Sequence, residues 1–283
     1  MYKKISIILS TYNEALIIKT SIDKIFSTLD NVEIILVDDN SIDGTLEILK
    51  TIDNKNFRFY SRKSRGLASA FLLGLINTNG DYIGWTDSNM PQLTHHFSEM
   101  IRKLETNDIV LLSRYVDGGG DQRSTMRVLS SKIINFFCRL ILGSEIKDYT
   151  SSIFLMRKEV LKYGVPIAYG HGEFFIEFLY KIKKNGIRIC ELPYVQPPDQ
   201  EGSKTASSFL MFFSLKNLKC HFLCNSKYFL TQAVHDAIQN QLQQHLNYLL
   251  HRRPQLLFQL ALMVLDIVVS LVLVVQQNIQ RLY

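Results

Sequence analysis

Short apolar runs alternate with amphipathic stretches along the N-terminal two thirds of the chain. Short apolar runs predict strands at 5–10, 32–37, 57–60, 82–86, 108–112 and 187–195. Amphipathic stretches predict helices at 14–29, 45–50, 66–77, 95–104, 124–142, 157–163 and 173–184. Strands that alternate with helices are typical of a mostly parallel sheet with helices on both faces. The predicted fold class is therefore α/β and Rossmann-like.

The pattern changes after residue 204. Residues 206–250 are largely helical in pattern, with Phe209, Phe212 and Phe213 on apolar positions and lysines between the apolar positions that follow. A helix of this kind can lie along a membrane interface. An ordinary core helix explains the same pattern equally well, so both interpretations stay open. We expect one large α/β domain over 1–205 and amphipathic juxtamembrane helices over 206–250.

Residues 256–275 form a continuous run that is apolar except for Gln259, Asp266 and Ser270. A run of this length can span a bilayer, although an acidic residue near the centre costs ~2.5–3.5 kcal/mol on insertion scales. A single transmembrane helix is the favoured interpretation, and a buried helix of a homo-oligomer or an interfacial hairpin are the alternatives. Because basic residues 251–253 precede the run, the N-terminal domain is expected on the cytoplasmic side.

The charge and the cysteine content limit which classes of ligand and of structural cross-link the chain can have. The formal net charge is +6, and 47% of the residues are hydrophobic. This mild positive excess suits an anionic ligand or a membrane surface. The sequence lacks the dense basic stripe that is typical of nucleic-acid binders. The four cysteines form no disulfide framework. Cys220 and Cys224 could supply half of a zinc site, but the sequence lacks the second pair of ligands. The apolar stretch after Lys4 is too short for a signal peptide, so none is predicted.

The segment 32–45, VEIILVDDNSIDGT, carries the strongest chemical signal. Its apolar run ends in two adjacent carboxylates, Asp38 and Asp39, before a polar turn and a helix. Carboxylates at the carboxyl end of a parallel strand lie where open α/β sheets bind ligands, and there they can accept hydrogen bonds from a ribose or a base. A plain strand-to-helix turn with Asp43 as the helix cap is the alternative.

Three further strand ends carry polar segments. The first strand is followed by residues 10–14, and the third by a basic loop in which Arg65 and Gly66 precede a helix, a place that can hold phosphate oxygens. The fourth strand is followed by Asp87 and Asn89, whose spacing lets both side-chain oxygens meet one hard cation. A lone Asp-x-Asn is usually a turn, but the four loops together predict a site for Mg²⁺ or Mn²⁺ and a diphosphate.

These motifs resemble a known family. The sequences TYNE at 11–14, VDDNSIDGT at 37–45, RGLASAFLLG at 65–74 and the Asp87 turn are similar to the nucleotide-sugar domain of family 2 inverting glycosyltransferases, which have the GT-A fold. The segments SRY at 113–115 with GGG at 118–120, DYTSSIF at 148–154 and GSK at 202–204 resemble the dolichol-phosphate mannose synthase subfamily and its bacterial polyprenyl-phosphate relatives. The likeness covers roughly residues 4–205.

The resemblance implies a role for each matched residue. A nucleotide-sugar site would be lined by Thr11, Tyr12, Glu14, Asp39 and Arg65, together with Asp38, Gly66 and Asp87. The cation would face Asp87 and Asn89. The acceptor phosphate would be held by Arg114, Arg127 and Lys204. The chain departs from the family pattern where Asn89 replaces a second Asp, which lowers the expected metal affinity, and at 198–201, PDQE, where an Arg is absent.

The implied reaction moves a hexose from a UDP- or GDP-sugar to a polyprenyl phosphate, such as a dolichyl or undecaprenyl phosphate, with inversion at the cytoplasmic membrane face. An anionic phosphate acceptor needs no strong base, whereas a hydroxyl acceptor does, and Asp148 is the candidate base. Asp87, Asp148, Arg114 and Arg127 form the predicted catalytic set. A transferase acting on a glycan or lipid hydroxyl, and a catalytically weak nucleotide-sugar-binding membrane subunit, are the alternatives.

Overall fold

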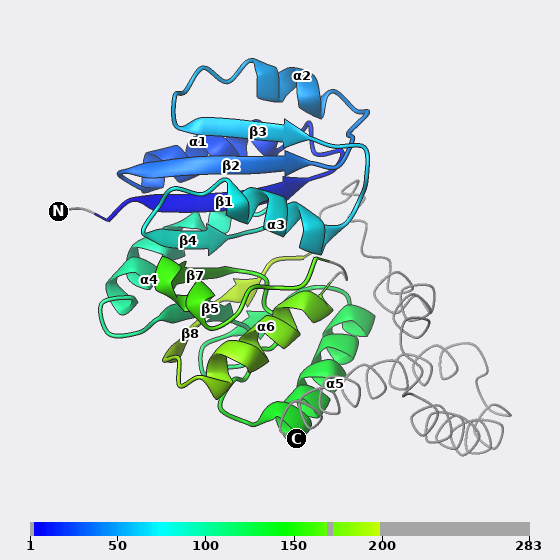
Figure 1. Cartoon of the computed structure of the whole chain (residues 1–283). Coiled ribbons are helices and arrows are strands. Elements are labelled where there is room, and N and C mark those ends of the chain that lie inside the picture. Colours follow the sequence, from blue (N-terminus) through cyan, green and yellow to red (C-terminus); the bar gives the residue numbers. More distant parts are fainter. Residues whose placement is uncertain (1–2, 169–171, 199–283) are drawn as a thin grey trace, which may run out of the picture. The chain divides into compact units, whose positions relative to one another are not determined.

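The computed structural model of the chain describes residues 3–168 and 172–198 (Figure 1). The predicted juxtamembrane helices over 206–250, the predicted span over 256–275 and Lys204 lie outside the described residues. Within the described ranges, no helix combines the length and the apolar character that a bilayer crossing requires.

A seven-stranded sheet runs through the centre of the fold in the order β3-β2-β1-β4-β7-β5-β8. All neighbouring pairs are parallel except those of β7, which is antiparallel to both β4 and β5. A separate parallel pair is formed by β6 and β9. The strands span β1 (Ile5–Thr11), β2 (Val32–Asp38), β3 (Phe57–Ser61), β4 (Tyr82–Trp85), β5 (Ile109–Ser113), β6 (Gly120–Asp121), β7 (Phe154–Arg157), β8 (Ile189–Pro193) and β9 (Val195–Gln196).

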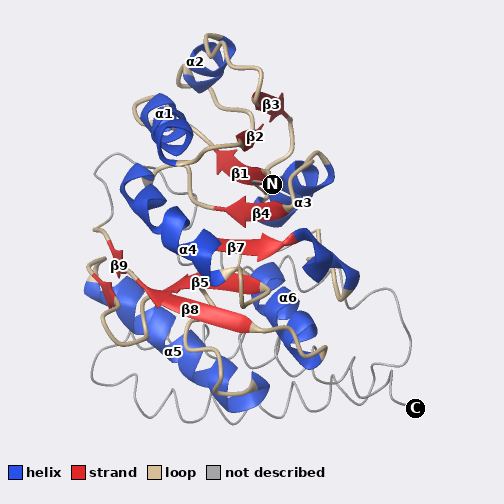
Figure 2. Cartoon of the chain, turned by 90° about the vertical axis from the view of Figure 1, so that its left-hand side faces the viewer, coloured by secondary structure: helices blue, strands red, loops and turns tan. Residues whose placement is uncertain are grey.

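Helices cover both faces of this sheet. Helices α1 and α4 lie on one face, and α3 and α6 lie on the other (Figure 2). The α-helices are α1 (Ile18–Thr28), α2 (Thr45–Lys50), α3 (Leu67–Ile76), α4 (Phe97–Lys103), α5 (Thr125–Leu142) and α6 (Glu173–Lys184), with short 3₁₀ segments η1 (Pro91–His96) and η2 (Lys158–Lys162). Helix α5 belongs to a second compact unit of the chain. The predicted mostly parallel α/β sheet is thus confirmed.

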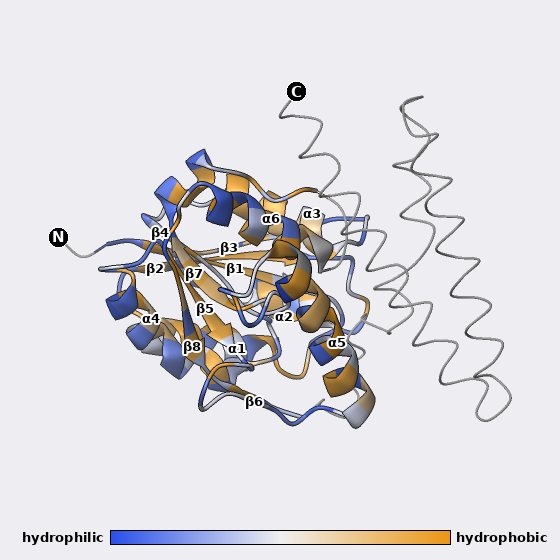
Figure 3. Cartoon of the chain, turned by 90° about the horizontal axis from the view of Figure 1, so that it is seen from below, coloured by the Kyte–Doolittle hydropathy of each residue, from blue (hydrophilic) through white to orange (hydrophobic). Residues whose placement is uncertain are grey.

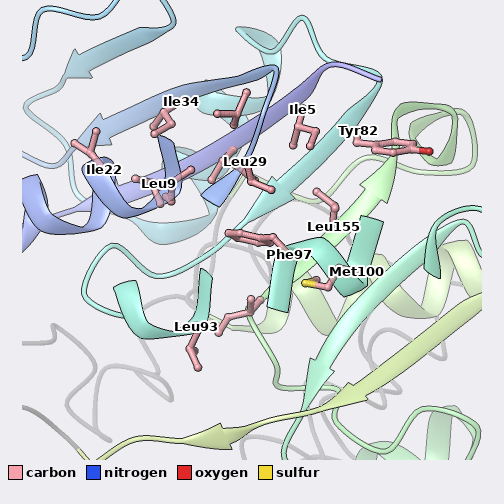
Figure 4. Packing of buried hydrophobic residues seen from close by; sticks show 14 of the residues in the cluster. Ile5, Leu9, Ile22, Leu29, Ile34, Tyr82, Leu93, Phe97, Met100 and Leu155 are labelled. Carbon is pink, nitrogen blue, oxygen red and sulfur yellow. The ribbon is translucent and has the colours of Figure 1, made fainter. Parts of the chain in front are cut away.

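The core explains why the strands read as apolar runs in the sequence. Every residue of β2 is buried, as expected for a parallel strand covered on both faces. Side chains from β1, β2, α1 and α4 pack into one cluster that includes Leu9, Ile34, Ile22 and Phe97 (Figure 4). The strands are largely hydrophobic along their length, whereas the outer surface of α4 is hydrophilic (Figure 3). This rigid core fixes the strand ends from which the candidate site is built.

Two element predictions are wrong in detail. The pattern predicts a helix at 157–163, but the structure has the short segment η2 preceded by strand β7. Strand β7 contains only the apolar residues Phe154, Leu155 and Met156 followed by Arg157, and periodicity cannot assign so short a run. The helix predicted from residue 14 begins instead at Ile18, and the backbone N–H of Glu14 donates a hydrogen bond to the hydroxyl of Thr45, the first residue of α2 (3.0 Å).

Candidate active site

The loops that follow β1, β2 and β4 meet at one edge of the sheet. Because β2 and β4 both flank β1 in parallel, their carboxyl ends share this edge. The backbone N–H of Asp39 donates to the carbonyl of Thr11 (3.0 Å), and the Ser88 hydroxyl donates to the carbonyl of Ser10 (2.6 Å). Asp39 and the Asp87 turn therefore lie on either side of the end of β1, at one edge of the sheet.

The two adjacent carboxylates after β2 have different surroundings. Asp38 is fully buried and accepts hydrogen bonds from the backbone N–H and hydroxyl of Ser41 and from the hydroxyl of Ser61. It fixes the turn. Asp39 accepts from Arg62 Nε (2.5 Å) and from the backbone N–H of Gly66 (2.8 Å). Asp39 thus ties the loop after β2 to the basic loop after β3.

Arg65 and Tyr12 come together from the loops after β3 and β1. The guanidinium carbon of Arg65 lies 3.5 Å from the centre of the Tyr12 ring. This cation–π contact places a positive charge beside the end of β1. The family resemblance predicts both residues at the nucleotide-sugar site, and the structure brings them to the same rim as Asp39.

Glu14 links the end of β1 to the turn that carries Asp87. Its carboxylate accepts hydrogen bonds from the hydroxyls of Thr11 (3.0 Å) and Ser88. Burial raises the pKa of Glu14 from 4.5 to about 7, the two hydroxyl hydrogen bonds partly oppose this rise, and the nearby Asp87 carboxylate adds to it. Glu14 therefore changes charge close to neutral pH.

This shift makes the stability of the protein pH-dependent. The folded state keeps the Glu14 proton to a higher pH than the unfolded state, so stability falls as the pH rises from 4.5 to about 7. The size of this fall is about 3 kcal/mol. We expect Glu14→Gln to lack this loss in the free energy of unfolding between pH 5 and pH 8, as measured by urea unfolding without metal. The exposed Glu105→Gln should behave like the wild type, and an unchanged pH slope in Glu14→Gln would contradict the assignment.

The turn after β4 presents two oxygen donors of the kind that hard cations prefer. Asn89 Oδ1 is buried and has no hydrogen-bond partner among the described residues. Asp87 accepts a hydrogen bond from Ser152 (3.4 Å); burial raises the pKa of its carboxyl, and the charges of Arg123 and Arg114 oppose that rise. A carboxylate next to an unpaired carbonyl oxygen fits a divalent cation that completes its shell with ligand oxygens and water. Within the described residues, no cluster of three or more acidic, His or Cys side chains offers a larger metal site.

Asn89 gives this turn one neutral ligand. We expect Asn89→Asp to tighten Mn²⁺ binding by about tenfold, because a second carboxylate adds a full negative charge to the cation's first shell. Titration of Mn²⁺ followed by the EPR signal of the free ion measures this directly. The exposed Asn54→Asp serves as the control for a change in net charge alone. Equal affinities for wild type and Asn89→Asp would show that residue 89 does not ligate the cation.

Arg114 and Asp148 form a buried pair. Arg114 donates through Nε (2.8 Å) and Nη2 (2.7 Å) to the two oxygens of Asp148, and Nη2 also donates to Thr150 (2.7 Å). Burial disfavours the guanidinium charge, but the Asp148 carboxylate outweighs it and raises the pKa of Arg114. Asp148 has no exposed surface, and both of its carboxylate oxygens accept hydrogen bonds from Arg114. This placement argues against the base role predicted for Asp148, because a base must reach the substrate.

Sequence reasoning missed Arg123. Its Nε and Nη2 donate to the two oxygens of Asp121 (2.8 and 2.6 Å), and Asp121 also lies 3.6 Å from Arg114 Nη1. The charge of Arg123 reaches Asp87. Arg123 belongs to none of the motifs, and it is connected to this region through Asp121, which lies beside Arg114 and in the strand that pairs with β9. Arg127, predicted to hold the acceptor phosphate, lies in α5 of the second compact unit and is not placed relative to these residues.

Comparison with known proteins decides the family. A model of the family described as glycosyl transferase family 2 matches residues 6–164. The chain belongs to this family. Its family 2 domain includes the strand ends that carry Asp39, Asp87, Asn89 and Arg114. The expected family is thereby confirmed.

Curated relatives of this family 2 chain include lipid-phosphate enzymes. The chain is 31% identical over 203 residues to a dolichol-phosphate mannosyltransferase of Pyrococcus furiosus, covering 68% of this chain and 56% of that relative. It is 27% identical over 198 residues to a polyprenol monophosphomannose synthase of Mycolicibacterium smegmatis, covering 66% and 75%. The chain thus spans little more than half the length of the first relative.

A solved structure shows the same fold. The glucosyl-3-phosphoglycerate synthase of Mycobacterium tuberculosis, in complex with UDP, superimposes with a TM-score of 0.55 at 21% identity, covering 70% of this chain and 73% of that one. At this identity the likeness shows the fold alone. The family 2 domain therefore has the GT-A fold, a mostly parallel sheet flanked by helices.

Proposed function

We propose that the chain transfers a hexose from a UDP- or GDP-sugar to a polyprenyl phosphate, with inversion, at the cytoplasmic face of a membrane. The observation that carries this proposal is the meeting of two polar groups at the rim. Asp39 and Arg65 gather on one side of the end of β1, the Asp87 turn lies on the other, and Glu14 connects the end of β1 to that turn through Ser88. One ligand with a polar nucleoside and a metal-binding diphosphate matches this arrangement.

The relatives support the acceptor class. Two of them are a dolichol-phosphate mannosyltransferase and a polyprenol monophosphomannose synthase. The apolar run at 256–275 and the mixed aromatic and basic pattern at 206–250 are consistent with a chain that works at a membrane. The mild positive charge of +6 suits anionic lipids as well as phosphate ligands.

The reaction needs alignment more than proton transfer. An oxygen of the acceptor phosphate forms a bond to the anomeric carbon on the face opposite the diphosphate, whose bond to that carbon breaks. The acceptor is already anionic at neutral pH, so the site requires no general base. Asp39 and Arg65 would orient the nucleoside end of the donor, and this positioning supplies a large part of the rate enhancement.

A divalent cation fits the residues present. Asp87 and Asn89 would hold it, since they offer a carboxylate and an unpaired buried carbonyl oxygen. When bound, Mg²⁺ or Mn²⁺ supplies charge neutralisation for the leaving diphosphate. The mycobacterial structural neighbour has been crystallised with Mn²⁺ and UDP, and also with Mg²⁺ and UDP, which supports the choice of these ions.

A transfer assay tests the proposal. The purified full chain is incubated with MnCl₂ and each of a panel of UDP- and GDP-hexoses labelled in the sugar, with undecaprenyl phosphate, undecaprenol or no lipid. We expect label in the organic phase only with the lipid phosphate, and none after EDTA. Transfer to undecaprenol at an equal rate would favour a hydroxyl acceptor. Nucleotide binding without any transfer would favour a non-catalytic subunit, and either result would contradict the proposal.

A further inference from the structure

The polar and charged residues around Asp87 come from strands on both sides of β4 in the strand order. The loops after β1, β2 and β3, which carry the nucleoside-side residues, precede β4 in the strand order. The other polar and charged groups come from beyond β4 in the strand order. Arg114 follows β5, Ser152 precedes β7, and Asp121 lies in β6, which pairs with β9. The Asp87 turn therefore has a donor side and an opposite side.

On the opposite side, Arg114 has little left to offer a ligand. Its side chain is 4% exposed, its Nε and Nη2 are engaged by Asp148 and Thr150, and its Nη1 faces Asp121 at 3.6 Å. Arg114 is therefore a positioning residue, because its guanidinium helps to hold Asp121 in place.

Arg123 is arranged differently. Asp121 holds its Nε and Nη2, and no other described residue accepts a hydrogen bond from it. A guanidinium has five N–H donors in a rigid fork, so the Nη1 edge of Arg123 stays available. The side chain is 17% exposed, compared with 4% for Arg114. Arg123 is thus oriented by a carboxylate at one edge and open at another.

The local charge also favours an anion here. The carboxylates of Asp87, Asp121 and Asp148 face the two guanidinium groups of Arg114 and Arg123. These five groups have a summed charge of −1, and a divalent cation bound at Asp87 would change that sum to +1. An anion that approaches from the side opposite the donor balances that charge next to the reacting centre.

We propose that Arg123 binds the phosphate of the acceptor through its open guanidinium edge, while Arg114 and Asp121 hold it in position. This inference rests on the proposed function, and it assigns the phosphate contact to a residue outside the motifs. A bidentate contact between guanidinium and phosphate is a strong charge-assisted hydrogen bond. Its loss should be visible in binding as well as in turnover.

Equilibrium binding to the full chain with Mn²⁺ tests Arg123. The probes are farnesyl phosphate, farnesol and the nucleoside diphosphates UDP and GDP. We expect Arg123→Gln to weaken farnesyl phosphate binding by about tenfold or more, and to leave farnesol and nucleotide binding within about twofold. Arg123→Lys should lose less, because it keeps the charge but not the fork. The matched control is Arg102→Gln, an exposed arginine on α4, which should bind all probes like the wild type.

The outcomes separate this inference from the proposed function. A wild type that prefers farnesyl phosphate to farnesol, together with an Arg123→Gln variant that keeps the same preference, overturns the role of Arg123 alone. An equal loss of all probes in Arg123→Gln assigns Arg123 a merely structural role and also overturns the inference. A wild type with no preference for the phosphate contradicts the proposed acceptor class itself, and the inference with it.

Discussion

Asp87→Asn should lower sugar transfer by about a thousandfold while the protein stays folded. Asp87 is the one charged oxygen donor of the turn that fits the cation, and the neutralisation of a leaving diphosphate is worth several kcal/mol. A thousandfold loss corresponds to about 4 kcal/mol in the activation free energy. Initial rates at saturating donor, with Mn²⁺ varied, measure the effect.

The stability of the same variant separates chemistry from folding. Burial raises the pKa of Asp87, so the folded state bears a cost for its charge at neutral pH that asparagine does not. We therefore expect the Tm of Asp87→Asn at pH 7.5, without metal, to equal or exceed that of the wild type. The exposed Asp53→Asn controls for the loss of a charge. Activity of Asp87→Asn within tenfold of the wild type would exclude Asp87 as the main cation ligand.

Asp148→Asn should have its largest effect on stability. Its carboxylate accepts hydrogen bonds from the side chain and the backbone N–H of Arg114 and from Thr150, in a fully buried position. Removing one partner of a buried ion pair leaves an uncompensated charge and costs about 3–5 kcal/mol. For a domain of this size we expect the Tm to fall by about 10 °C.

This variant also distinguishes a structural role from a catalytic one. Transfer to a lipid phosphate is measured at a temperature well below the lowered Tm, with the exposed Asp117→Asn as the control from the same region. We expect Asp148→Asn to lose much of its stability and only a modest part of its rate. A normal Tm with a thousandfold slower rate would restore Asp148 as a general base.

Parallel strands make the rim of the site predictable from sequence. Buried parallel strands are continuous apolar runs, and their carboxyl ends must meet at one edge. The apolar runs alone therefore assign Asp39, Asp87 and Asn89 to one region. Tyr12 and Arg65 join them because their loops follow strands of the same sheet.

The remaining features depend on contacts that local patterns do not encode. Strand β7 is a four-residue antiparallel insertion between β4 and β5, and nothing in its sequence specifies that position. Glu14 acquires its raised pKa because the folded chain buries its carboxyl and brings Asp87, distant in the sequence, close to it. In the sequence Asp148 resembles a free carboxylate, because its partner Arg114 is distant along the chain. Arg123 likewise joins the site through Asp121, which lies beside Arg114 and in the strand that pairs with β9.

Asp39 and Asp87 are proposed to hold two parts of one nucleotide ligand. Calorimetric titration of UDP and GDP into the wild type, Asp39→Asn and Asp87→Asn, each with and without Mn²⁺, tests this proposal most directly. We expect that Mn²⁺ tightens nucleotide binding to the wild type, that Asp39→Asn weakens binding with or without Mn²⁺, and that Asp87→Asn loses only the gain from Mn²⁺. Tightening by Mn²⁺ that persists in Asp87→Asn, or nucleotide binding that is indifferent to Asp39, would contradict it.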